Sequence, residues 1–266
     1  MWWFQQGLSI LPSALVIWSA ASLLFSYTAA VLLRHVDPLV PYISDTGTTP
    51  PESCLFGIML NIAALLGIAT MYVRYKQVSA LNPEDHKILR LNKIGFVLGL
   101  ISCFGLCIIA NFQKSALFPV HVFGSCLAFG IGAIYILVQT ILSYKMQPGI
   151  HGKNIFWIRL TVLLWCALSI LNMLISSAVL HSGPYGTDVV QKLHWDPQEK
   201  GYAFHIISTA SEWSLAFSFL SFFLTYIRDF QKISLHTEAL LHGHNLYDTH
   251  QQFLEDDQEI QIAGNI

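Results

Sequence analysis

The sequence predicts an all-α, polytopic membrane protein: a bundle of six transmembrane helices with both termini in the cytosol. Charged residues make up only 11% of its 266 positions, whereas soluble domains carry about 25%. Hydrophobic residues make up 54%, and the mean hydropathy is +0.53. A water-facing surface of this size needs more charge, so an ordinary soluble enzyme and a disordered regulator are excluded. The net charge of −2 gives no general attraction for polyanions, and we expect no nucleic-acid partner.

Six apolar runs are each long enough for one crossing of the bilayer, which takes about 20 helical residues. The first five contain no Asp, Glu, Lys or Arg, and the sixth contains a single acid, Glu212. The runs show no strict alternation of apolar and polar residues, so we do not expect strands. The predicted helices cover residues 8–33, 54–73, 94–113, 118–142, 160–180 and 203–227. They form a predicted transmembrane domain over residues 1–232.

The first helix is preceded by Trp2 and Trp3, which we interpret as anchors at the membrane interface. The segment has no basic residue before its apolar run and no clear cleavage site, so we do not interpret it as a signal peptide. Pro12 lies near the start of the helix, where its missing N–H costs little.

Lys and Arg residues set the predicted orientation, because they gather on the cytosolic side of a membrane. Ten of the 14 lie in the loop after the second helix, in the loop after the fourth, or just after the sixth. The four on the opposite side are Arg34, Lys114, Lys192 and Lys200. This distribution places both termini in the cytosol and the three odd-numbered loops in the lumen or outside.

Small residues at four-residue steps predict how the third and fourth helices pack. Such steps allow close approach of helices in lipid, where no hydrophobic drive brings helices together. The short connection between these two helices makes them antiparallel neighbours, and we expect their small faces to meet. The alternative is that the glycines of the third helix form a dimer face. The residues are Gly95, Gly99 and Cys103 on the third helix, and Gly124, Ala128 and Gly132 on the fourth.

The cysteines indicate neither a disulfide framework nor a metal centre. Cys54, Cys103, Cys107, Cys126 and Cys166 lie within predicted helices or at a helix start, and no CxxC pattern is present. We therefore expect no cofactor.

Glu212 is the one acid within a predicted membrane core. A charged side chain there costs free energy, so an acid at such a position is usually interpreted as functional. His205 and Ser208 lie on the same face of that helix, toward the lumen. By depth, further polar residues fall at a similar level, which suggests one polar layer in the lumenal half of the bundle. These residues are Asn61, Asn172 and Ser125.

Three interpretations of this layer remain open. A protonated Glu212 bonded to Asn or Ser would be ordinary contact between helices. A site for a lipid headgroup, an ion or a proton is the second. The third is a zinc site formed by Glu212, His205 and His121, although histidines near a membrane surface are more often simply hydrated. A hydrolase would need more than these residues offer.

The connecting segments differ in character. The first lumenal loop contains PYISDTGTTPPES, residues 41–53, which predicts turns and an extended exit, and therefore a structured cap. The segment after the sixth helix is acidic, with seven acidic and two basic residues from Arg228 to Ile266. An anionic cytosolic leaflet repels acid, so we expect residues 233–266 to form a loosely ordered cytosolic tail that reaches toward protein partners.

Four stretches resemble the Frag1/DRAM/Sfk1 membrane family, and within it the damage-regulated autophagy modulators. They are PYISDTGTTPPES, ANFQ at residues 110–113, Glu212–Trp213 and Asp229–Phe230. The likeness extends over residues 1–232. The most specific stretch is PYISDTGTTPPE, which includes Pro41, Ser44, Asp45, Gly47, Pro50, Pro51 and Glu52.

The resemblance implies a multi-pass protein of lysosomal and related endomembranes that promotes autophagy and is linked to cell death. It implies no catalytic residue. Relatives in the wider family act in phosphoinositide and GPI-lipid biology, so lipid handling remains an alternative function.

Three functions follow from these observations. The first is a non-enzymatic regulator that organises partners at a membrane. The second is a lipid-binding protein or transporter that uses the polar layer around Glu212, and the third is an intramembrane lipid enzyme. A cavity opening onto Glu212 would favour binding or transport, and a carboxyl group sealed among helix side chains would favour a structural role.

Overall fold

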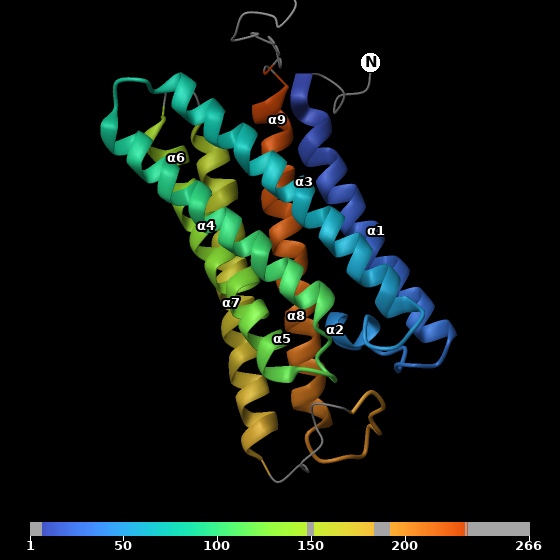
Figure 1. Cartoon of the computed structure of the whole chain (residues 1–266). Helices are drawn as coiled ribbons and strands as arrows, with labels where there is room; N and C mark the ends of the chain where they lie inside the picture. The colour runs from blue at the N-terminus through green and yellow to red at the C-terminus, as the bar shows by residue number, and fades with distance from the viewer. Residues whose placement is uncertain (1–6, 148–151, 184–191, 232, 234–266) are drawn as a thin grey trace, which may run out of the picture. The chain divides into compact units, whose positions relative to one another are not determined.

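The computed structural model describes residues 7–147, 152–183, 192–231 and 233, and all of the regular structure in these ranges is helical (Figure 1). Two short segments complete the helices: a 3₁₀ turn, η2 (Gly7–Ser9), and a π-helical turn, η3 (Cys126–Ile131). The α-helices are α1 (Ile10–Leu32), α2 (Ile43–Thr46), α3 (Glu52–Leu81), α4 (His86–Asn111), α5 (Phe118–Ser125), α6 (Gly132–Lys145), α7 (Lys153–Ser182), α8 (Tyr202–Leu224) and α9 (Tyr226–Phe230). All but the first residue of the predicted tail lies outside the described ranges.

Six helical segments are long and apolar enough to cross a membrane, which confirms the predicted helical class and the number of spans. The segment α5–η3–α6 forms one span, and α8–α9 forms another. Both ends of the bundle's chain lie at the same end of the helices, since the N–H of Leu8 donates to the carbonyl of Ile233 at 3.0 Å.

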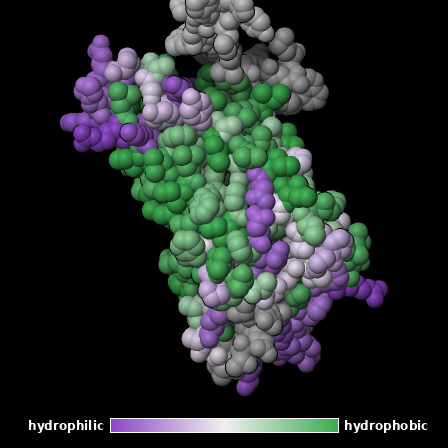
Figure 2. All heavy atoms as spheres, in the orientation of Figure 1, coloured by the Kyte–Doolittle hydropathy of each residue, from purple (hydrophilic) through white to green (hydrophobic). Residues whose placement is uncertain are grey.

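The spans pack as a ring in chain order. Each contacts the next, from α1 to α3, α4, α5–η3–α6, α7 and α8, and α8 contacts α1 to close the ring. The main apolar core lies toward the end of the ring where the termini meet, and includes Leu15, Met71, Tyr135 and Phe222. Figure 2 shows apolar surface over the middle of the helices and hydrophilic surface gathered near the α3–α4 connection and near the opposite end. This distribution suits a bundle whose waist faces lipid.

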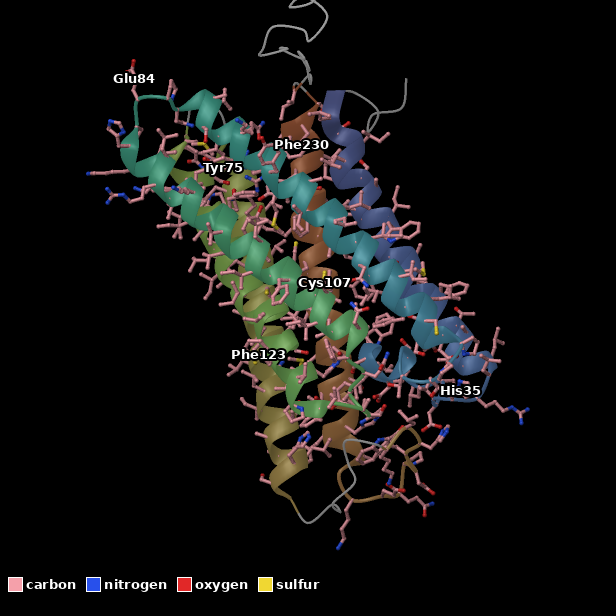
Figure 3. All side chains as sticks on the ribbon, viewed as in Figure 1. His35, Tyr75, Glu84, Cys107, Phe123 and Phe230 are labelled. Carbon is pink, nitrogen blue, oxygen red and sulfur yellow. The ribbon has the colours of Figure 1, made fainter. Side chains whose placement is uncertain are left out.

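Several helices run further than the charge-free segments that predicted them. Helix α3 continues to Leu81, and α4 already begins at His86. Asp85 caps α4 by accepting hydrogen bonds from the backbone N–H groups of Ile88 and Lys87, and these bonds lower its pKa. Figure 3 shows Glu84 in this connection and His35 at the opposite end of the bundle.

The extension corrects one expectation. Basic residues that we assigned to loops on charge alone lie within helices, and two of them, Arg74 in α3 and Arg159 in α7, are fully buried. A prediction that ends each helix at the first charged residue therefore makes these helices too short.

The third and fourth spans lie against each other, with their closest approach at Gly105. A Cβ atom at Gly105 would lie 2.4 Å from the backbone nitrogen of Ala128 and 2.7 Å from the carbonyl oxygen of Gly124. Beside it, the hydroxyl of Ser102 donates to the carbonyl of Ala128 within η3, at 2.7 Å. The expected face of the fourth helix, Gly124 and Ala128, therefore does meet the third helix. On the third helix the contact is made by Gly105 and Ser102, which the four-residue series from Gly95 does not include.

The other small residues of the predicted faces lie against this chain's own side chains. A Cβ at Gly95 would meet Val138, and one at Gly99 would meet Met71. Cys103 faces Gly67 of α3, and a Cβ at Gly132 would meet Phe219 of α8. Because Gly95 and Gly99 are covered from within, the alternative dimer face is not open to a second copy.

Replacing Gly105 by Ala should destabilise the protein by about 1–3 kcal/mol, because backbone atoms of the neighbouring helix cannot move aside. Thermal unfolding in detergent measures this change. Gly130 is the matched control, since a Cβ there meets nothing within 4 Å. Gly130→Ala should be neutral or stabilising by up to about 1 kcal/mol. Equal effects at the two glycines would contradict the proposed contact.

Candidate functional site

Glu212 of α8 lies at the inner side of the ring and binds the backbone of the first connection. Its Oε2 accepts a hydrogen bond from the N–H of Ile43 at 2.7 Å, and the N–H of Ser44 is a further backbone partner. These are the first two N–H groups of α2, which have no partner within the helix. Glu212 therefore caps a one-turn helix that lies 169 residues earlier in the chain.

The neighbouring residue fastens the same segment. The indole N–H of Trp213 donates to the carbonyl of Pro41 at 2.8 Å, and its ring meets Tyr27 of α1 edge-on. Within α2, the hydroxyl of Thr46 donates to the carbonyl of Ile43 at 2.7 Å. Two of the sequence stretches that carry the family resemblance are thus in direct contact.

Asp45 of α2 forms a buried ion pair with Lys114, whose Nζ lies 2.5 Å from Asp45 Oδ1. Burial raises the pKa of Asp45, and the ammonium group opposes that rise. The same ammonium lies over the ring of Tyr42, 4.4 Å from its centroid. Burial likewise raises the pKa of Tyr42 to about 12. Lys114 is the residue directly after the ANFQ stretch, so this contact lies beside a third stretch of the resemblance.

The rest of the motif continues the packing toward α3. A Cβ at Gly47 would lie 2.4 Å from the ring of Phe56, so only glycine fits there. Glu52 is buried at the start of α3 and binds the ring of His35. The segment between Gly47 and Glu52 contains a cis peptide bond, which joins Pro50 to Pro51.

The third lumenal loop, by our orientation, lies against the first. Asp37 accepts hydrogen bonds from the N–H of Trp195 at 2.7 Å and from His194 at 2.9 Å. Partial burial works against ionisation of Asp37, but these hydrogen bonds prevail and lower its pKa. Trp195 in turn stacks on His205, with ring centroids 4.4 Å apart. The structured cap that we predicted for the first loop therefore also includes residues of the third loop, such as His194 and Trp195.

The column of His205, Ser208 and Glu212 faces the Tyr42–Ile43 segment. The ring of Tyr42 meets the ring of His205 edge-on, with their centroids 5.3 Å apart. Ser208 is a side-chain hydrogen-bond partner of Tyr42. Ser208 also bonds Ser177 of α7 at 2.8 Å. The column forms the support on which the first loop rests.

The predicted polar layer does not form as one set. Asn172 is exposed on the outer side of α7. Asn61 forms a reciprocal pair with Asn111 of α4, through hydrogen bonds of 3.2 and 3.1 Å. Glu212, in contrast, faces the interior of the ring. Depth along a helix was therefore a poor guide, because the direction of a side chain depends on how the helix is rotated.

His121 and Ser125 of α5 lie on the interior side. His121 Nδ1 donates to the carbonyl of Phe112 at 2.8 Å, and Ser125 donates to the carbonyl of His121 at 2.9 Å. His205 is held between Trp195 and Tyr42 instead of approaching His121. Over the described residues, no group of three His, Cys, Asp or Glu side chains could hold a metal ion, which is against the zinc interpretation.

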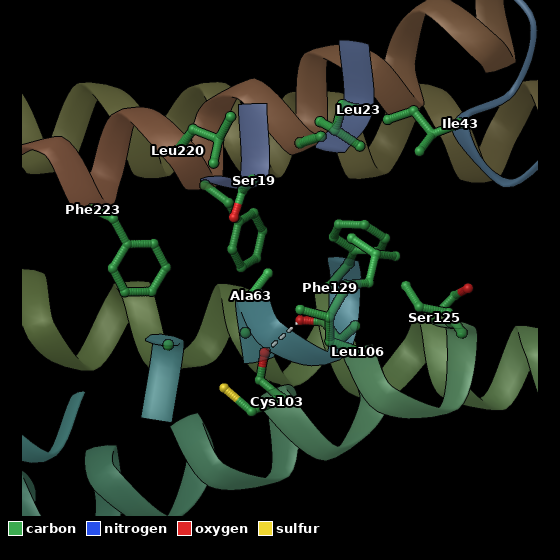
Figure 4. Close-up of a pocket in the computed structure, with 18 of the residues that line it drawn as sticks. Ser19, Leu23, Ile43, Ala63, Cys103, Leu106, Ser125, Phe129, Leu220 and Phe223 are labelled. Carbon is green, nitrogen blue, oxygen red and sulfur yellow. Dashed lines mark hydrogen bonds between the residues drawn. The ribbon is translucent and has the colours of Figure 1, made fainter. Parts of the chain in front are cut away.

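A cavity of about 150 Å³ opens onto Glu212 within the ring (Figure 4). Its walls come from α1, α3, α4, the α5–η3–α6 span and α8, and they are mostly apolar. Glu212, His121, Ser125 and Ser44 line its end near α2, and Ser19 of α1 projects its hydroxyl into the middle. Glu212 therefore combines two situations that we had treated as alternatives, since it caps α2 and also lines a cavity.

A second polar cluster lies near the end where the termini meet. Asp229 Oδ2 accepts from Arg159 at 2.6 Å and from Arg74 at 3.3 Å, and both guanidinium groups are fully buried. Arg159 also donates to Ser143 and to Thr225. The cluster joins α3, α6, α7 and the α8–α9 span through one carboxylate.

Sequence reasoning missed most of these partners. Lys114, Arg74 and Arg159 were counted only as loop charges that set the orientation. The sequence analysis identified Asp229 only as part of the Asp229–Phe230 stretch of the family resemblance. The sequence offers no usable signal for this cluster, because Arg228 lies between Asp229 and the apolar run and is the nearest cation along the chain.

The family model of the Frag1/DRAM/Sfk1/Cwh43P N-terminal domain matches residues 7–233, a range that includes every residue that the structure describes. The chain belongs to this family. Its similarity to individual relatives is also high. It is 67% identical to DNA damage-regulated autophagy modulator protein 2 of Homo sapiens, over 94% of this chain and 94% of that protein. The same protein from Rattus norvegicus is 66% identical over 94% and 93%.

The family likeness also extends to a more distant relative. DNA damage-regulated autophagy modulator protein 1 of Homo sapiens is 42% identical over 90% of this chain and 98% of that protein. No solved structure matches the chain. The expected likeness to the damage-regulated autophagy modulators of the Frag1/DRAM/Sfk1 family is confirmed. In this chain, the most specific family motif, PYISDTGTTPPE, is the segment that Glu212, Trp213 and Lys114 hold in place.

Proposed function

We propose that the protein is a non-catalytic modulator of autophagy, located in the lysosomal membrane and related endomembranes and linked to cell death. The observation that carries this proposal is the identity of 66–67% over 94% of the chain to proteins named DNA damage-regulated autophagy modulator protein 2. The names of these relatives describe modulators of autophagy, which supports a non-catalytic role. The distribution of Lys and Arg supports an orientation with both termini in the cytosol.

The contacts at Glu212 support a scaffolding role. Glu212 and Trp213 each bind the backbone of the first loop, and Asp45 is neutralised by Lys114. In these contacts the polar groups fasten a loop to the bundle. The partners of this scaffold would bind the cytosolic tail, residues 233–266.

Truncation after Ile233 tests the role of the tail. Because Ile233 supplies the carbonyl that binds Leu8, this truncation keeps the last described contact of the bundle. We expect autophagic flux to fall while the melting temperature in detergent changes little. Flux is measured in cells lacking the endogenous protein, as lysosome-dependent degradation of a long-lived cytosolic reporter. Full flux with the truncated chain would reject recruitment through the tail.

The cavity supports a second candidate function, the binding or transport of a lipid at Glu212. Two substitutions separate it from a purely structural role. Glu212→Ala leaves the N–H of Ile43 without its acceptor and should destabilise the protein by about 1–3 kcal/mol. Glu212→Gln retains an acceptor oxygen but removes the charge.

Under the scaffolding proposal, Glu212→Gln keeps autophagic flux and a protease-resistant first loop, whereas Glu212→Ala loses both. Under the lipid proposal, Glu212→Gln loses flux although the loop stays protected. Glu199→Ala, in an exposed loop, is the control and should change neither measurement. Full flux with Glu212→Ala would count against both roles for this side chain.

A further inference from the structure

The outer face of α7 carries an asparagine whose side chain has no partner in the described part of the chain. Asn172 is exposed and lies about 12 Å along the helix from Leu180, where the apolar run ends. Its backbone carbonyl accepts from the hydroxyl of Ser176, but its amide group bonds to none of the described residues. Hydrocarbon offers no hydrogen bond either, and an asparagine side chain is too short to reach the headgroups from this depth. An unpaired amide in lipid costs free energy, which a partner at this face would recover.

α7 is also the span that the bundle covers least. It contacts α6 and α8 in the ring, and 22% of its apolar window is buried, against 33–44% for the other five spans. Its outer side therefore remains open to another helix.

The residues around Asn172 have the spacing of a seam between two helices. Trp165, Leu168, Asn172 and Ile175 follow one another at steps of three, four and three residues, and each of them is exposed. Steps of this kind place side chains along the contact line of two helices that cross at about 20°. A single asparagine in such a seam fixes the register of the pair.

A second copy of this chain is the partner that this face fits. An amide has both donors and an acceptor, so it is complementary to another amide. Asn61 and Asn111 demonstrate this complementarity within the chain, through their reciprocal pair. Two copies inserted in the same orientation are related by a two-fold axis along the membrane normal. Their α7 helices then run parallel, and the two Asn172 side chains lie at the same depth.

We propose that the protein forms a two-fold symmetric dimer through the outer face of α7, in which the two Asn172 amides bind each other. This face is separate from the glycine series of α4, which is covered from within. It also leaves the loop held by Glu212 and the cavity beside it outside the interface, because both lie on the inner side of the ring.

Energy transfer between labelled copies tests the dimer on the full-length protein in phosphatidylcholine vesicles. Separate samples carry a donor or an acceptor fluorophore on the N-terminus, and the protein-to-lipid ratio is varied to obtain a dissociation constant. We expect Asn172→Leu to raise this constant by about three- to thirtyfold, the range that interhelical hydrogen bonds in membranes contribute. Asn172→Gln keeps an amide and should stay closer to the wild type. The melting temperature in dilute detergent should change little in both variants, since the amide has no partner within the described part of one copy.

Two exposed leucines provide a matched comparison. Leu168 lies in the proposed seam and Leu65 lies on α3, and they are 57% and 66% exposed. Leu168→Ala removes packing from the seam and should raise the dissociation constant. Leu65→Ala should leave it unchanged.

Disulfide crosslinking localises the contact. Ile175→Cys and Leu174→Cys are introduced separately into a chain whose exposed cysteines, Cys54 and Cys126, are replaced by serine. Ile175 belongs to the seam, whereas Leu174 is equally exposed but points about 100° away around the helix. Mild oxidation in vesicles should join two copies through position 175 and not through position 174.

The proposal would be overturned by wild-type protein that shows only the energy transfer of random proximity at every ratio. A dissociation constant that Asn172→Leu leaves unchanged, or equal crosslinking at positions 174 and 175, would also reject it. Crosslinking of position 175 to a different protein in native membranes, with monomers in vesicles, would assign the face to another partner and reject the dimer. These measurements use no autophagy readout, so the proposed function stands or fails separately.

Discussion

Replacing Asp229 by Asn should destabilise the protein by about 3–5 kcal/mol, because the change leaves two buried guanidinium groups without their shared carboxylate. Arg74 and Arg159 are both fully buried, so water cannot replace the lost charge. The amide still accepts a hydrogen bond, which isolates the effect of charge from that of shape. Thermal or denaturant unfolding in detergent measures the change.

Glu84→Gln is the matched control, since Glu84 is exposed in the α3–α4 connection. It should change the free energy of unfolding by less than about 0.5 kcal/mol. A double variant with Arg159→Gln should restore part of the loss, because one of the two unpaired cations is then removed. An Asp229→Asn protein as stable as the wild type would mean that this cluster does not hold the helices together.

Lys114→Met should also be strongly destabilising, by about 3–5 kcal/mol at neutral pH, because Asp45 loses its counter-ion in a buried site. The loss should shrink as the pH falls. Burial already raises the pKa of Asp45, and Lys114 is the group that lowers it. Without Lys114 the pKa rises further, so Asp45 takes up a proton in mild acid and its unpaired charge disappears.

Unfolding measured at pH 7.5 and at pH 5 tests this sign. The difference between Lys114→Met and the wild type should be larger at the higher pH. Lys192→Met is the control, since Lys192 forms a partly exposed pair with Glu199. Such pairs contribute up to about 1 kcal/mol, and we expect a small effect with little pH dependence. A penalty for Lys114→Met that grows in acid would contradict the assigned role of Asp45.

Several features were accessible from sequence because they depend on composition along the chain. The low charge content and the length of the apolar runs predicted six helical spans, and six such segments are present. Hydrocarbon requires every backbone group to bond within its own helix, so a sufficiently long apolar run is enough to define a span. Pro41–Ser53 was also recognisable as a structured loop from its turn-forming residues.

Side-chain direction was not accessible in the same way. Asn61, Asn172 and Glu212 have similar depths, yet Asn61 pairs with Asn111, Asn172 faces outward, and Glu212 faces the cavity. A helix can rotate about its axis without changing its hydropathy. The rotation is set by contacts such as Gly105 against Ala128, which involve residues that no pattern within one helix can pair.

The sequence by itself determined the number and order of the spans, the loop that carries the family motif, and Glu212 as the exceptional acid. Only the tertiary structure decided what Glu212 does, because its partner Ile43 is distant in sequence and offers a backbone N–H, which every residue but proline has. The same reason applies to Lys114 and Arg159. Charge at the edge of an apolar run identifies a residue as basic, and only the folded neighbours decide whether that charge meets water or a buried carboxylate.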